Sequence, residues 1–353
     1  MQPRYNHEAL LRFAHELLVT TGVDAEKASA MADVLVEADL MGHDTHGLAL
    51  LAPYLADIES GGMAKSGEPK ILSDRAAAMA WDGMRLPGPW LVVRAIEAAV
   101  PRARQFGTCS IAIRRSHHIA CLAAYLKRVT DQGLMILLVS SGPDTGGVAP
   151  HGGRGSVYTP NPIAAGWPTD GAPVLMDISA SITTHSMTAR LHREGRKLPG
   201  TWLIDADGNP TDDPSVMFAE RRGAMLPLGG IEVGHKGYAL GLLGEALTGG
   251  LAGHGRADPA EGWAANVLVQ ILDPACFGGE EDFRRQMQWL AEACRGTPPR
   301  PGFDRVRLPG EGALARRAVQ LERGIALHPS AVAGLRPWSD KLHVSFPQPQ
   351  AAH

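Results

Sequence analysis

The chain is short of several features that would assign it to a particular class. Only four of its 353 residues are cysteines, namely Cys109, Cys121, Cys276 and Cys294, and none forms a CxxC pair. Neither a disulfide framework nor a thiolate zinc site is therefore expected, and we expect reduced thiols in a cytoplasmic protein. No apolar run approaches the length that spans a bilayer, and residues 1–13 lack the layout of a secretory signal.

The chain also lacks a large excess of either positive or negative charge. The formal net charge is −3 at pH 7, with 44% apolar and 20% charged residues. A protein without a basic field is not expected to bind nucleic acid or an anionic membrane surface. At 353 residues the chain exceeds what one hydrophobic core usually holds, so two domains are expected.

Three nucleotide-binding and hydrolytic motifs are missing. No GxGxxG follows a predicted strand, no GxxxxGK[ST] is present, and no GxSxG occurs. These absences argue against a Rossmann site, a P-loop and a nucleophile elbow. Any dinucleotide phosphates would then be held by backbone N–H groups at helix starts and by lysine. The candidates are a helix expected to begin near His118 and the helix expected from Lys236, although Lys236 is equally well explained as a solvated cation.

Hydrophobic periodicity predicts an α/β fold of the α+β type. Helical spacing covers most of residues 7–38 and 89–107. Alternating or buried strands are expected at 109–115, 134–142, 173–181 and 265–277, with helices at 116–133, 236–253, 280–296 and 313–325. We therefore expect a helical domain in residues 1–107, completed by C-terminal helices within 280–340, and an α/β domain in residues 108–279.

The stretch GHDTHGLALLAPYL, residues 42–55, carries two histidines between two helical patterns. If they share a helix face, His43 and His46 could bind a metal, with His117 or His118 as a further ligand. The HExxH and CxxC patterns of well-defined zinc sites are absent, so no metal is expected. His46 is equally compatible with an exposed or core histidine and with a catalytic one, because imidazole exchanges a proton near neutrality and Thr45 could orient it.

Several motifs together resemble one family. DTHGLALLAPYL is similar to SHGxxRxxxY, RRSHHIACLAAYL to NSxHFGAAGYY, VYTPNPIAAGWPT to LGTNPIAxxxPT, and VLMDISAS to a DMAxS stretch. DADGNPTDDP, LPLGG, HKGYALGLLGEALTGGLAG and LPGE follow in the same order. From about Leu10 to about Leu335 the chain resembles the malate/L-lactate/L-sulfolactate dehydrogenase family, which is distinct from the Rossmann-type lactate and malate dehydrogenases.

The resemblance implies hydride transfer between NAD or NADP and a 2-oxo or 2-hydroxy acid, or a cyclic imine acid. It implies a helical domain with a non-Rossmann α/β sandwich that binds the dinucleotide, and a homodimer with its active site near the subunit interface. His46 matches the proton-donor histidine and Thr45 the serine beside it. The cofactor-contacting positions correspond to His118, Ile119, Ala120, Cys121, Leu122, Thr159, Pro160, Asp177, Ile178, Ser179, Ala180, Ser181, Ile182, Thr183, His235, Lys236, Gly310 and Glu311.

Four positions depart from the family pattern. Leu50 stands where the family has an arginine that pairs with the substrate carboxylate, and Met187 stands where some members have an acidic residue that supports the histidine. Pro160 replaces a threonine of the family, and Ala120 replaces a glycine. Leu50, Met187 and His118 are the expected substrate-contacting residues. The substrate is thus either less acidic or more apolar than lactate, or its carboxylate meets another cation such as Arg114 or Arg190. The alternatives are a catalytically altered member that still binds a dinucleotide and a metal-dependent hydrolase.

Overall fold

A seven-stranded mixed sheet forms the centre of the molecule. The computed structural model describes residues 3–144 and 146–350. The strand order is β1 (Lys70–Arg75), β2 (Ala78–Asp82), β3 (Thr108–His117), β10 (Ala264–Leu272), β4 (Met135–Ser141), β5 (Ile163–Trp167) and β6 (Val174–Ile178). Only β2 and β3 pair in parallel among the described strands of this sheet. This mixed, largely antiparallel sheet confirms the expected non-Rossmann α/β fold class.

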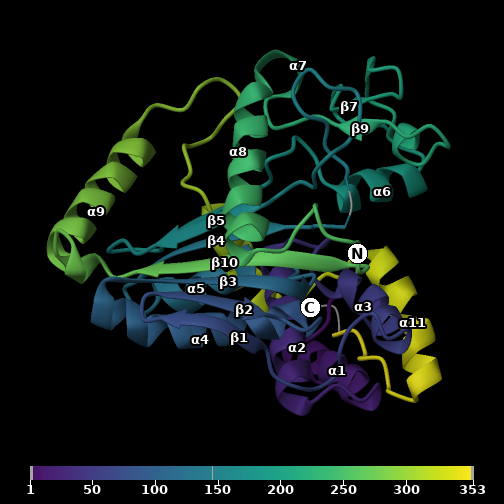
Figure 1. The fold of residues 1–353 in the computed structure, drawn as a ribbon, viewed down its shortest axis with the longest axis horizontal. Coiled ribbons are helices and arrows are strands. Elements are labelled where there is room, and N and C mark those ends of the chain that lie inside the picture. The colour runs from purple at the N-terminus through teal and green to yellow at the C-terminus, as the bar shows by residue number, and fades with distance from the viewer. Residues whose placement is uncertain (1–2, 145, 351–353) are drawn as a thin grey trace.

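Helices cover both faces of the sheet, as Figure 1 shows. α4 (Gly88–Phe106) and α5 (Ala123–Thr130) lie on one face, where Ile111 and Ile113 of β3 enter the main core. α8 (His235–Glu245) and the π-helical turn η3 (Ala246–Gly250) pack on the other face, against β4 and β10. The side chains of successive strand residues point to opposite faces, so β3 serves two cores.

The remaining helices lie at the ends of the sheet. α1 (His7–Thr20) packs on α2 (Ala25–Met41), and η1 (Leu48–Leu50) leads into α3 (Leu51–Glu59). α10 (Glu311–Arg323) packs on α2, and α11 (Pro329–Leu342) packs on α1, α3 and η1. α9 (Glu280–Gly296) instead stands at the opposite end of the molecule (Figure 1). The domain boundaries at residues 107 and 279 stay a prediction.

A small lobe stands above the sheet in Figure 1. It contains α6 (His185–Arg193), β7 (Leu203–Ile204), β8 (Pro210–Thr211), η2 (Pro214–Met217), β9 (Ala224–Met225) and α7 (Gly230–Val233). Its core includes Val148, Leu191 and Leu203, separate from the main core. A final short turn, η4 (Pro274–Cys276), follows β10. Among the described residues, no helix is both long and apolar enough to cross a bilayer.

One local expectation was wrong, and two strands lie where no element was predicted. β1 and β2 join the central sheet from residues 70–82, and β1 is largely exposed and carries no apolar alternation. The helix expected from residue 116 begins only at Ala123. Residues up to His117 instead continue β3, where His117 pairs with Ala264 of β10, and Ala120 takes a positive φ of 59° that no helix permits.

Candidate active site

His46 lies in a tight turn and not on a helix face, which corrects the expected HxxH helix. α2 ends at Gly42, whose φ of 83° is the left-handed C-cap that glycine favours. The chain then turns, with the His46 N–H donating to the His43 carbonyl at 2.8 Å, before η1 begins at Leu48. This turn places both histidines at the junction of α2 and η1, half-buried and close to the small lobe.

Asp39 of α2 supports this turn from below. Its buried carboxyl group accepts the Leu48 N–H at 2.7 Å, so it caps η1. A Cβ on Gly47 would lie 2.4 Å from the Asp39 Cγ, so only glycine fits between them. Burial raises the pKa of Asp39 from 3.8 to about 8, against the Leu48 hydrogen bond that lowers it. Asp39 is therefore largely protonated at neutral pH.

His46 is held by its neighbour and is neutral at pH 7. The Thr45 hydroxyl lies 2.9 Å from Nδ1 of His46. A hydroxyl both donates and accepts, so Thr45 can satisfy either protonation state of that nitrogen. Burial, followed by the positive charges of His43 and Arg190, lowers the pKa of His46 from 6.5 to about 4. The imidazole is thus available as a proton acceptor over most of the ordinary pH range.

His118 is the nearest aromatic neighbour of His46. Their ring centroids lie 6.1 Å apart at an interplanar angle of 30°. The His118 ring also stacks on Trp263 at a centroid distance of 4.9 Å, and the Tyr54 hydroxyl lies 2.8 Å from its Nδ1. Burial, with the charges of His46 and His117, keeps the pKa of His118 well below 6.5. The two neutral imidazoles therefore form a pair in one wall of the site.

A third histidine, His117, packs against the residues of this wall. Nε2 of His117 lies 2.8 Å from a carboxylate oxygen of Asp57 in α3, and the His117 ring packs against Tyr54 and Trp263. Burial lowers the pKa of His117 to about 4, although the Asp57 hydrogen bond opposes this. Of the adjacent pair His117–His118, only His118 contacts the His46 ring.

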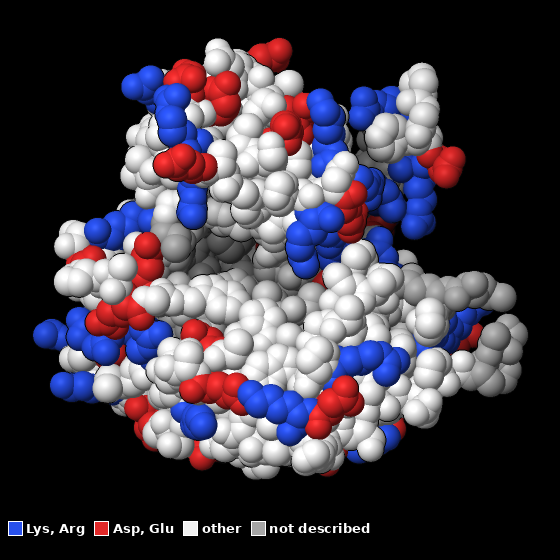
Figure 2. Space-filling view, turned by 90° about the vertical axis from the view of Figure 1, so that its right-hand side faces the viewer, with Lys and Arg blue, Asp and Glu red and all other residues white. Residues whose placement is uncertain are grey.

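Arg190 of α6 links the small lobe to the histidine turn. Its Nη1 lies 3.2 Å from both carboxylate oxygens of Asp44. Between the small lobe and the body below it, the surface is hollowed (Figure 2). Arg114, the other cation considered for a substrate carboxylate, donates from Nε to Asp82 at 3.0 Å. Of the two, only Arg190 is close enough to lower the pKa of His46.

The expected cofactor segments meet along β6 and the chain that follows it. Asp177 accepts the Ala123 N–H at 2.8 Å, so it caps α5 below the buried segment Ile119–Leu122. Burial raises the pKa of Asp177 and the charge of His43 opposes it. Ser179 donates to the Pro160 carbonyl, and the Thr159 hydroxyl bonds to Asn161. The Asp177–Thr183 run, including Ile178, Ala180, Ser181 and Ile182, thus adjoins both the 118–122 and the 159–160 segments.

The other predicted positions lie further out. Gly310 approaches Leu175 of β6, where a Cβ would lie 2.7 Å from the Leu175 Cβ, and Glu311 pairs with Arg295. His235 and Lys236 are exposed at the start of α8, and the ring neighbour of His235 is His151 at 5.7 Å. Neither makes a hydrogen bond, ion pair or ring contact with the histidine pair. Both residues lie at the start of α8, as expected, but neither contacts His46.

The expected substrate positions differ in exposure. Leu50 is 8% exposed and belongs to the main core, so it presents little surface to a ligand. Met187 is 37% exposed in the first turn of α6, which Thr184 caps through the Met187 N–H. His118 is half-buried beside His46. The position that carries arginine in the family pattern is therefore an apolar packing site here.

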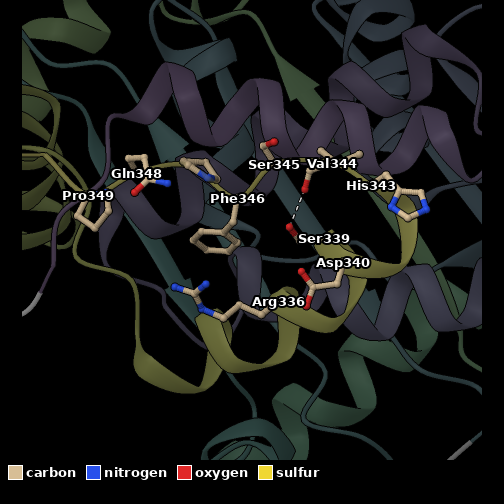
Figure 3. A pocket seen from close by; sticks show the side chains of 10 residues that line it. Arg336, Ser339, Asp340, His343, Val344, Ser345, Phe346, Gln348 and Pro349 are labelled. Carbon is tan, nitrogen blue, oxygen red and sulfur yellow. Dashed lines mark hydrogen bonds between the residues drawn. The ribbon is translucent and has the colours of Figure 1, made fainter.

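A surface cavity of about 640 Å³ lies elsewhere, between α11 and the C-terminal tail. Figure 3 shows Arg336 beneath the Phe346 ring, at 5.1 Å from its centroid, and the bond from Ser339 to the Val344 carbonyl. None of the predicted site residues lines this cavity. Within the part of the chain that the structure describes, no three His, Cys, Asp or Glu side chains gather so as to hold a metal ion.

Sequence reasoning missed four residues of this site: Asp39, Asp44, Tyr54 and Trp263. Tyr54 carries a signal, because it stands in the quoted stretch at the tyrosine of the family pattern SHGxxRxxxY. Asp44 also adjoins the histidines in sequence. Asp39 gives no signal, because α2 carries four other charged residues, and Trp263 gives none, since it reaches His118 through the pairing of β10 with β3.

Comparisons with known proteins concern the family and the fold of the chain. The family described as malate/L-lactate dehydrogenase matches residues 5–336. An L-lactate dehydrogenase of Cupriavidus necator is 34% identical over 346 residues, which cover 95% of this chain and 97% of that one. A (2R)-3-sulfolactate dehydrogenase (NADP(+)) of Chromohalobacter salexigens is 32% identical, over 89% of this chain and 91% of the relative.

Among solved structures, malate dehydrogenase from Entamoeba histolytica superposes with a TM-score of 0.92, over 99% of this chain and all of that one. Its sequence identity is 22%, so this likeness concerns the fold alone.

Proposed function

The chain belongs to the malate/L-lactate dehydrogenase family, whose members are NAD(P)-dependent dehydrogenases, and on that premise we propose the reaction it catalyses. It transfers hydride between a nicotinamide dinucleotide and a 2-oxo or 2-hydroxy acid, or a cyclic imine acid, with His46 as proton donor and acceptor. The observation that carries this proposal is the position of the half-buried His46 ring. It is hydrogen-bonded to Thr45, its centroid lies 6.1 Å from that of His118, and Arg190 of α6 contacts the same turn.

The residues present fit a dinucleotide. The Thr183 hydroxyl is buried and has no partner among the described residues, so it can take a ligand hydrogen bond. Lys236 is exposed in the first turn of α8, where the helix dipole and a cation together favour phosphate. We propose that the segments 118–122, 159–160, 177–183 and 235–236 hold the dinucleotide, with Gly310 and Glu311 against the outer end of β6.

When bound, the nicotinamide supplies or accepts the hydride. The chain itself supplies position and the proton. In the oxidation of a hydroxy acid, neutral His46 removes the hydroxyl proton, while Thr45 accepts from its Nδ1–H. In the reverse direction the protonated ring gives that proton to the carbonyl oxygen or imine nitrogen. His118 has its Nε2–H free to hydrogen-bond the same substrate oxygen or the nicotinamide amide.

A second candidate is a member altered toward neutral or apolar substrates. The buried Leu50 and the exposed Met187 favour it, because both are apolar at positions where the family pattern places charge. This enzyme would reduce a neutral ketone as fast as the corresponding acid.

We also propose that the protein is a homodimer. Three leucines are exposed along α8 and just past η3, at 49% for Leu242 and Leu243 and 59% for Leu251. Exposed apolar side chains clustered on one element are typical of subunit contacts. Sedimentation equilibrium would show twice the mass of the 37.5 kDa chain, and a monomer at micromolar concentration would contradict the proposal.

Titration with NADH and with NADPH, followed by nicotinamide fluorescence, tests the proposed activity first. We expect saturable binding of at least one of them. Rates with L-lactate, L-malate and sulfolactate, and with the matching 2-oxo acids, then identify the substrate. Failure of both dinucleotides to bind, or turnover that requires neither, would refute the proposed function. Activity without nicotinamide that a chelator abolishes would instead support a metal-dependent hydrolase.

A further inference from the structure

We propose that Arg190 binds the carboxylate of the substrate, in place of the arginine missing at position 50, and that Asp44 holds the guanidinium in position for it. The inference rests on the proposed function and deepens it, because it assigns the substrate to acids with a carboxylate next to the reacting carbon. It also gives α6 of the small lobe a part in the active site.

The reaction requires such a cation close to His46. In a 2-oxo or 2-hydroxy acid the carboxylate is bonded directly to the carbon that exchanges hydride. The anchor for the carboxylate must therefore be a near neighbour of the group that moves the proton. Leu50 has no charge and is packed in the core. Of the cationic side chains that the structure describes, only His43 and Arg190 are near enough to lower the pKa of His46.

His43 is less suited to be this anchor. Its charge acts on Asp177, the buried carboxyl group at the start of α5, as well as on His46. A histidine is also charged only in acid, whereas a guanidinium is charged at every working pH. Arg114 is held by Asp82 on β2, and Arg115 lies near both Asp82 and Glu261. These pairs leave Arg190 as the permanent cation beside the histidine pair.

The Arg190 side chain has donors to spare. It is 13% exposed, and its Nη1 alone contacts Asp44, at 3.2 Å from each oxygen. Its Nε and Nη2 atoms bond to none of the described residues. Nε–H and an Nη2–H lie side by side along one edge of a guanidinium and match the two oxygens of a carboxylate. Asp44 thus fixes one edge and leaves the bidentate edge for a ligand.

The position of the pair supports the same conclusion. Asp44 belongs to the histidine turn, whereas Arg190 belongs to the small lobe, so their contact joins these two parts of the molecule. Asp44 is 42% exposed, and an ion pair so open to water contributes little to stability. A carboxylate bound to Arg190 would offset the charge that disfavours protonation of His46. Substrate binding would thereby help His46 to carry the proton it must donate.

Steady-state kinetics of Arg190→Gln test this inference. The substrates are the 2-oxo acid reduced fastest by the wild type and its methyl ester, which lacks the charge. We expect KM for the acid to rise about 10²-fold, since one partner of a partly buried charge pair is lost, while KM for the ester stays within about threefold. Arg190→Lys should fall between wild type and Arg190→Gln for the acid, because a lysine keeps the charge without the fork.

Arg193→Gln is the matched control, because Arg193 lies on the same helix and is exposed, with its Nε bonded to the Ala189 carbonyl. It should change neither KM. A readout that a merely structural role would not move is the pH profile. Arg190→Gln should raise the pH below which oxidation slows, since a positive charge near His46 is gone.

An equal rise of KM for acid and ester, or no rise for either, would overturn the inference. So would a wild type that reduces the ester as well as the acid. Failure of the proposed function would be visible in the wild type itself, as an absence of dinucleotide binding. Failure of the Arg190 inference would be visible only in the comparison of the variants.

Discussion

The Tyr54 hydroxyl lies 2.8 Å from Nδ1 of His118, and the Ala120 N–H points to the same nitrogen at 3.3 Å. A backbone N–H can only donate, so Nδ1 of His118 must accept, and the ring proton must be on Nε2. The side of the ring that remains available to a ligand is therefore a hydrogen-bond donor.

Tyr54→Phe should lower kcat/KM about tenfold, because a lost hydrogen bond costs about 1 kcal/mol and leaves His118 less firmly oriented. Histidine ring ¹⁵N shifts would report the tautomer directly, with Nδ1 unprotonated in the wild type. Tyr158→Phe is the matched control, since the Tyr158 hydroxyl is buried without a partner among the described residues. A normal rate in Tyr54→Phe would show that Ala120 alone fixes the ring.

His46→Asn should reduce kcat by about 10²–10⁴, the usual contribution of a general acid or base. The affinity for NADH or NADPH should stay within about threefold. Single-turnover kinetics and fluorescence titration separate the two effects. His192→Asn, a histidine of α6 that stacks on Phe218 at 4.5 Å, should behave as wild type. If His46→Asn turned over normally, another group would have to move the proton.

The two reaction directions should differ in their dependence on pH. His46 must be neutral to act in oxidation, and its pKa is lowered from 6.5 to about 4. From about pH 5 to pH 8, kcat/KM for the hydroxy acid should therefore be nearly constant. In reduction His46 must be protonated, so kcat/KM should fall by about tenfold for each unit by which pH rises. An oxidation profile that falls below about pH 6.5 would contradict the lowered pKa.

Asp39→Asn should change how stability depends on pH. In the folded chain the pKa of Asp39 is raised from 3.8 to about 8, so the folded state binds one more proton than the unfolded state between these values. The resulting stabilisation is complete below pH 3.8 and is lost as pH rises through about 8. Asn keeps an acceptor for the Leu48 N–H but does not titrate.

Urea unfolding of both proteins at pH 5 and pH 8 checks this prediction. The wild type should lose stability relative to Asp39→Asn between the two values, because effects of all other groups cancel in the comparison. If the difference in stability between the two proteins did not depend on pH, the pKa of Asp39 would not be raised on folding. The carboxylate would then be ionised and hydrated by water at the Gly47 turn.

Much of the fold could be predicted because it depends on local pattern. The strands at β3, β4, β6 and β10 alternate or run apolar according to which faces are buried, and Gly42 and Gly107 end their helices in left-handed conformations. The irregular His118–Leu122 segment could not be predicted in this way. β3 extends to His117 through its pairing with β10, which is distant in the sequence, so α5 begins later than the helical spacing of the apolar residues indicates.

The site shows the same division. His46 was identifiable from its chemistry and from the family motif, and the structure places its ring beside that of His118. The roles of the two histidines stay a prediction. Its low pKa could not be predicted, since it depends on burial and on Arg190 from another lobe. The choice of Arg190 over Arg114 likewise required knowledge of their partners, Asp44 and Asp82, which sequence spacing does not reveal.

The position of β10 between β3 and β4 has a consequence for biosynthesis. During synthesis β3 and β4 leave the ribosome long before β10, so both strands at first lack the strand that pairs with them. Their facing edges expose unpaired N–H and C=O groups until residues 264–272 arrive, and such edges invite pairing with other chains. Trp263 arrives only with this strand, so the nascent enzyme gains its finished histidine wall in the same step that closes its sheet.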